Sequence, residues 1–109
     1  MREEIPILAF ADGMASPDKA GAKRAKKYMD EIVHDAARPG AAASYRKQTI
    51  AHLLTVVRSQ RPRLVRAHAL RMLGLIGGKP ESNALAPLEV DREVGEDARM
   101  ARERLQRSR

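Results

Sequence analysis

An internal repeat of 29 residues is the feature that most constrains how this 109-residue chain can fold. A shift of 29 positions superposes apolar residues of one segment on those of another: Val65 on Val94, Ala69 on Ala98, Met72 on Ala101 and Ile76 on Leu105. Within each copy these residues are three or four positions apart, which is the spacing of one face of an α-helix. A repeat of this length accommodates a helix, a turn, a second helix and another turn. We therefore expect helical hairpins that stack and bury each other's apolar faces.

The same spacing along the rest of the chain predicts an all-α protein with about five helices. The expected helices span about 17–37, 45–58, 63–76 and 80–90, and Asp91-Arg92 then turns into a fifth helix that runs to about 106. Pro87 lies inside the fourth helix, where it removes one backbone hydrogen bond, and we expect it to bend or shorten that helix. Residues 5–10 are expected to form either a short extended arm or an extra turn of helix packed across the bundle, and the packed arm is preferred. No alternation of apolar and polar residues is long enough to predict a sheet.

Composition favours one domain with a small-residue core. Aromatic residues make up 3% of the chain and Trp is absent, so the core must be built from aliphatic side chains and Ala. We expect a single domain, 1–109, comprising an arm (1–15), N-terminal helices (16–62) and a repeat region (63–109). The absence of Cys excludes disulfides, thiolate metal sites and thiol nucleophiles, and it fits a reducing compartment such as the cytoplasm. The N-terminal residues match neither a signal peptide nor a membrane span.

The repeat region has a distinctive order of small, branched and glycine positions. These are Val65-Arg66, Ala69, Leu73-Gly74, Ile76-Gly77, Leu85, Pro87, Leu88, Asp91, Val94 and Ala98. In this order, residues of about 64–107 resemble short HEAT-like repeats of the phycobilisome-lyase type. The resemblance implies a right-handed α-α superhelix and a scaffold or protein-binding role. Arg102 stands where the preceding repeat has Leu73, and we expect it on the outer face of a terminal repeat, where a polar residue would cap the stack.

Groupings typical of catalysis are absent from the sequence. The three histidines are more than 15 residues apart and form no metal-binding motif: His34, His52 and His68. Neighbouring carboxylates such as Glu96 and Asp97 point about 100° apart on a helix and do not share a site. Gly77 and Gly78 follow a helix, whereas a phosphate-binding loop precedes one. We therefore expect no catalytic residue, metal or cofactor.

The net charge of +7 is confined to the middle of the chain. Residues 37–79 contain nine basic residues and no acidic one, while the segments on either side each carry a net charge of −1. The candidate partner- or anion-binding residues are Arg46, Lys47, Arg58, Arg61, Arg63 and Arg66. If the four arginines between positions 58 and 66 converge at one inter-helix turn, they form a cluster suited to phosphate or to an acidic protein.

Three interpretations of this basic segment remain open. The arginines could pair with carboxylates of flanking helices or remain solvated, they could bind an acidic protein, or they could contact nucleic acid. Because aromatic residues for base stacking are few, nucleic-acid binding would depend on the phosphate backbone and on salt. The first functional hypothesis is a non-catalytic protein–protein interaction or scaffold module. The alternative is sequence-independent nucleic-acid binding through the basic middle. Partly covered helix faces at the open ends of the stack would also allow a homodimer, and no membrane partner is expected.

Overall fold

The computed structural model describes residues 6–107, and over this range the chain forms helices joined by short turns, with no strand. The all-α class predicted from the sequence is therefore confirmed. The elements are α1 (Ile7–Met14), α2 (Lys19–Ala37), α3 (Ala43–Val57), α4 (Arg63–Ile76), α5 (Lys79–Leu85), the 3-10 helix η1 (Ala86–Val90) and α6 (Gly95–Arg107).

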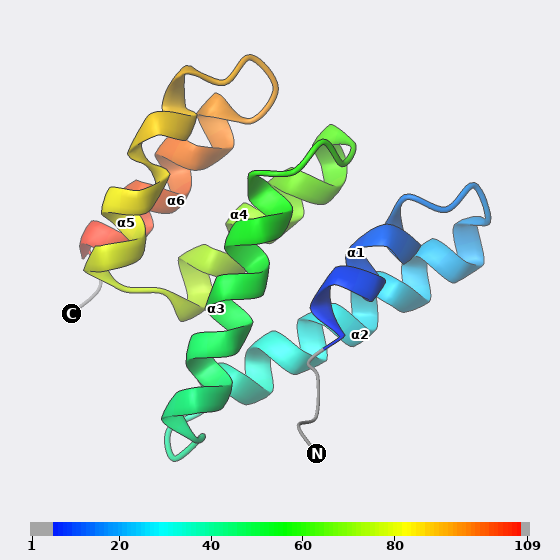
Figure 1. Ribbon diagram of the computed structural model, residues 1–109, viewed down its shortest axis with the longest axis horizontal. Coiled ribbons are helices and arrows are strands. Elements are labelled where there is room, and N and C mark those ends of the chain that lie inside the picture. The colour runs from blue at the N-terminus through cyan, green and yellow to red at the C-terminus, as the bar shows by residue number, and fades with distance from the viewer. Residues whose placement is uncertain (1–5, 108–109) are drawn as a thin grey trace.

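The helices form three hairpins that lie side by side. Helix α1 packs on α2, α3 on α4, and α5 with η1 on α6. Neighbouring hairpins meet through α1 and α3 in one layer and through α2, α4 and α6 in the other. Figure 1 shows α1, α3 and α5 nearer the viewer, with their partner helices behind them. The extents of 36 × 35 × 21 Å match two layers of helices, each about 10 Å thick.

Residues related by the 29-residue shift lie on neighbouring elements. Val65 and Ala69 belong to α4, Ala98 belongs to α6, Val94 lies directly before α6, and all four are buried. Helices α4 and α6 run in the same direction, because the Arg63 guanidinium lies 3.6 Å from the Asp97 carboxylate near both helix starts, whereas Gly74 lies against Ala101 and Arg104 near both ends.

The preferred N-terminal arm was wrong and the alternative of a packed turn of helix was closer, since residues 7–14 form the helix α1. Ile7 and Ala11 lie one turn apart and are fully buried, so this short helix has its own apolar stripe. Pro6 occupies the N-cap, where its missing N–H leaves no helical hydrogen bond unmade. A side chain on Gly13 would place its Cβ 2.9 Å from the Cβ of Ala25, so glycine permits the close approach of α1 to α2. Position 5 of the predicted arm lies outside the described residues.

The segment around Pro87 behaves as predicted, and the last helix starts later than predicted. Helix α5 ends at Leu85 and continues as the 3-10 turn η1. Asp91 then holds the turn into α6, because its Oδ1 accepts the backbone N–H groups of Glu93 (2.7 Å) and Val94 (3.1 Å). Gly95 is required here, since a Cβ at this position would lie 2.5 Å from the Glu89 carbonyl oxygen. The turn predicted at Asp91-Arg92 therefore continues through Val94 before the helix begins.

Arg102 does not lie on an outer face of the stack as predicted. Its side chain is 23% exposed and contacts the other helical segments of its own hairpin. Its Nε donates to the Ser82 carbonyl (2.9 Å), and its Nη1 pairs with Glu89 (2.7 Å). Arg102 thus connects α6 to α5 and η1 through polar contacts, at a position where the preceding repeat has Leu73.

Candidate functional site

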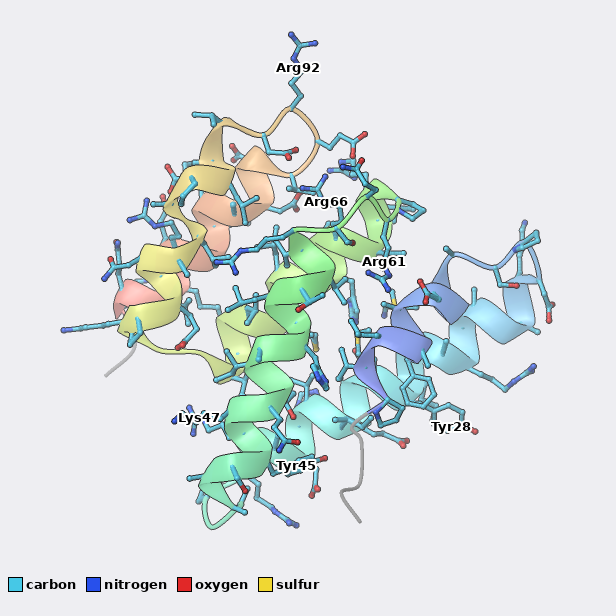
Figure 2. All side chains as sticks on the ribbon, viewed as in Figure 1. Tyr28, Tyr45, Lys47, Arg61, Arg66 and Arg92 are labelled. Atoms are coloured by element: carbon cyan, nitrogen blue, oxygen red, sulfur yellow. The ribbon has the colours of Figure 1, made fainter. Side chains whose placement is uncertain are left out.

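Arg66, one of the predicted binding residues, is committed to the fold. It is 8% exposed, and its Nε donates to the Val57 carbonyl at 2.9 Å. Its remaining nitrogens contact the Asp91 carboxylate at 2.9 Å and that of Glu93 at 3.4 Å. Figure 2 shows Arg66 between the α3–α4 turn and the loop before α6. The side chain therefore joins the second hairpin to the third.

Two further arginines of the same turn also pair with distant carboxylates. The Arg61 Nε lies 2.8 Å from Asp12 of α1, and Figure 2 shows this side chain directed toward the first hairpin. Arg63 donates to the Glu93 carbonyl at 3.0 Å and lies 3.6 Å from Asp97. We call Arg61, Arg63 and Arg66 the turn arginines. They start from one turn and reach different neighbours.

The other three predicted residues lie on or next to α3. Arg46 donates to the carbonyl of Ile76 at 2.8 Å and so supports the end of α4. Lys47 and Arg58 are exposed, and neither has a carboxylate within 4.0 Å among residues 6–107. The six residues thus do not form one cluster, and their role in binding a partner stays a prediction.

Arg66 acts strongly on its partner Asp91. The Arg66 guanidinium and the N–H groups of Val94 and Glu93 all stabilise the charged carboxylate, and together they lower the pKa of Asp91 to about 2. The lowered pKa reflects a structural role, because the groups that lower it are the contacts that hold the loop before α6 in place. This carboxylate is not poised to exchange protons near neutral pH.

A separate groove opens on the layer formed by α2, α4 and α6, with a volume of about 720 Å³. We call it the groove. The residues that line it are Met14, Ala22, Lys23, Lys26, Leu64, Ala67, His68, Leu70, Arg71, Gly74, Asp97, Met100, Ala101, Arg104 and Arg107. Helix α4 contributes residues from its first turn to its last and lies between the other two helices, so it forms the floor.

Five basic side chains line this groove, and all are exposed. We call them the groove cations: Lys23, Lys26, Arg71, Arg104 and Arg107. Lys26 lies 3.9 Å from Asp30, and the other four have no carboxylate within 4.0 Å in the described part of the chain. Asp97 is the one carboxylate in the lining, and it already lies near Arg63. The groove therefore presents uncompensated positive charge.

Apolar side chains are exposed in the same groove. Leu64 at the start of α4 is 74% exposed, and Met100 of α6 is 58% exposed. Met14 and Ala67 lie beside them in the lining and are partly buried. Large exposed apolar residues that share a hollow are typical of surfaces that bind another molecule.

A partly buried His–Asp pair joins the floor of the groove to its α2 wall. His68 of α4 lies with its Nε2 2.5 Å from Oδ1 of Asp30 on α2. Burial lowers the pKa of His68, although the hydrogen bond to Asp30 acts in the opposite direction. A neutral imidazole can donate its Nε2–H to the carboxylate of Asp30, so this pair links α4 to α2.

A smaller hollow of about 490 Å³ lies between the α3–α4 turn and the loop before α6. Its lining combines Arg58, Arg66 and Arg92 with Asp91 and Glu93, so its charges largely offset one another. Figure 2 shows the Arg92 side chain pointing away from the molecule. This hollow is therefore a poorer candidate than the groove.

The sequence did not indicate the groove, because its cations come from three segments far apart in the chain. Only Arg71 belongs to the basic middle segment. Lys23 and Lys26 lie on the expected helix over about 17–37, on the face opposite its apolar residues, and Arg104 and Arg107 lie among acidic residues near the C-terminus. The available signal was the pairing of cations at three-residue spacing on two helices, which places each pair on one face.

Comparisons with protein-family models, curated proteins and solved structures gave no match. Residues 6–107 contain no group of three or more metal-binding side chains. No helix in this range is both long enough and apolar enough to cross a membrane.

Proposed function

We propose that this protein is a non-catalytic interaction module that binds another protein through the groove. The observation that supports this proposal is the combination of unpaired cations and exposed apolar side chains in one hollow. Such a surface gains from a partner that supplies both carboxylates and apolar side chains. The HEAT-like resemblance of residues 64–107 supports a scaffold role of this kind, with the hairpins arranged as a right-handed superhelix. We expect the protein to act in the cytoplasm.

Affinity capture with matched variants tests the proposal. The groove variant combines Arg71→Glu with Arg104→Glu, and the control combines Lys47→Glu with Arg58→Glu, which gives the same change of charge on or beside α3. A protein retained by the wild type and the control from a nuclease-treated lysate of the source cells, and lost from the groove variant, supports the proposal. A partner lost only from the control would instead support the basic segment predicted from the sequence.

Nucleic-acid binding is the second candidate, and the five groove cations favour it. Phosphate contacts would make such binding strongest at low salt, so fluorescence anisotropy with labelled duplex DNA at about 50 mM salt gives the best chance of detecting it. Binding by the wild type that the groove variant loses would favour this second candidate. Absence of binding under these conditions would remove it.

A further inference from the structure

The lining of the groove changes character from one end to the other. Leu64, Ala67 and Met100 lie in the first turns of α4 and α6, whereas Arg71, Arg104 and Arg107 lie farther along. Because α4 and α6 run in the same direction, the apolar residues gather toward one end and the arginines toward the other. Lys26 and Lys23 lie one and two turns before Asp30, which contacts His68, so they add positive charge on the α2 side of the apolar end.

We propose that the groove binds an acidic segment of a protein that carries carboxylates along its length and apolar side chains at the end that meets Leu64 and Met100. This inference rests on the proposed function and specifies the partner's chemistry. Charge complementarity identifies the acidic part, because five cations face one carboxylate in the lining. The exposure of Leu64 (74%) and Met100 (58%) identifies the apolar part, because contact with apolar side chains would remove this surface from water.

The same residues favour a protein segment over nucleic acid. A phosphate backbone would pair with the arginines but would leave Leu64 and Met100 without apolar partners. The lining contains no Phe, Tyr or Trp on which a base could stack, and the ring of His68 is buried. Methionine has a flexible, polarizable side chain and adapts to differently shaped apolar partners, so Met100 suits the recognition of peptides.

Selection from a displayed library of random short peptides tests the inference without a known partner. The wild-type protein is the bait, and each selected peptide is then measured against Arg104→Glu, Leu64→Ser and the control Lys47→Glu. We expect the selected peptides to be enriched in both carboxylates and large apolar residues. Each groove substitution should weaken their binding by about tenfold or more, while Lys47→Glu leaves it nearly unchanged.

The outcomes separate this inference from the proposed function. Peptides that need the groove but are neutral or basic would overturn the acidic partner and leave the interaction module standing. Acidic peptides that are insensitive to Leu64→Ser would overturn the apolar half of the inference. If no peptide depends on the groove and duplex DNA does, both the inference and the proposed function fail. Leu64 and Arg104 are exposed and lie outside the core, so we expect the variants to fold. Circular dichroism of each variant checks this.

Discussion

The turn arginines and the groove cations are two basic regions that differ in whether carboxylates pair with them. The turn arginines lie in the most basic stretch of the sequence, yet each contacts a carboxylate from another hairpin. The groove cations are spread over three helices, and four of the five contact no carboxylate among the described residues. The density of positive charge along a sequence therefore does not identify a binding surface. What matters is whether the fold brings carboxylates from distant segments to those cations.

The largest expected difference between the two regions is in stability. Arg66→Leu would leave the Val57 carbonyl and the Asp91 carboxylate without their buried partner, and we expect it to lower the free energy of unfolding by about 3 kcal/mol. Arg71→Leu in the groove should change it by less than about 0.5 kcal/mol, because that side chain is exposed and unpaired. Urea denaturation measures both, and equal losses would contradict the distinction.

A substitution at Gly95 tests the loop that presents the carboxylates of Asp91 and Glu93 to the turn arginines. Gly95→Ala would place a Cβ against the Glu89 carbonyl and displace the loop that presents Asp91 and Glu93, with an expected loss of about 2 kcal/mol. Gly21→Ala is the matched control within α2, where the nearest contact is the carboxylate of Asp18, the far end of a side chain on the surface. Thermal denaturation compares the two, and a neutral Gly95→Ala would show that the close approach is unimportant.

The pH dependence of stability should also distinguish the two regions. The folded protein lowers the pKa of Asp91 from 3.8 to about 2, so Asp91 stabilises the fold fully above about pH 4, and this contribution is lost as the pH falls toward 2. Urea denaturation at several acidic pH values should show a shallower decline in this window for Arg66→Leu than for the wild type. Arg71→Leu should follow the wild-type slope. An unchanged slope in Arg66→Leu would argue against the coupling of Arg66 to Asp91.

The smallest effect is expected at the edge of the turn. The pair between Arg61 and Asp12 is partly solvated, with the Asp12 side chain 66% exposed, so its coupling energy should be about 0.5 kcal/mol. A double-mutant cycle with Arg61→Ala and Asp12→Ala measures it. A coupling above about 2 kcal/mol would show that α1 depends on this contact as strongly as α6 depends on Arg66.

Much of the helical pattern could be predicted because it depends on local spacing. Helix α4 begins and ends where the sequence indicates, since its apolar stripe ends at Gly77 and Pro62 precedes it. The sequence left an arm and a turn of helix open for residues 5–10, a short apolar stretch that contains Pro6. Pro6 and Gly13 both have a place in α1. Their roles in starting the helix and admitting a close neighbour become visible only when α2 is in place.

The site was harder to predict because pairing depends on tertiary structure. Nothing near Arg66 in the sequence reveals that Asp91, 25 residues later, will lie against it. The 29-residue repeat does bring α6 beside α4, yet it does not show which cations will find partners. Internal pairing was one of the interpretations left open, and the turn arginines follow it.

The stacking of the hairpins determines which parts of the molecule a partner bound in the groove would stabilise. The first and third hairpins each pack against the middle one, so either outer hairpin could open while the rest stays folded. A partner seated in the groove would touch α2, α4 and α6 at once and would therefore hold both outer hairpins closed. Binding would then appear as slower hydrogen exchange at the two ends of the molecule, including amides that the partner never contacts.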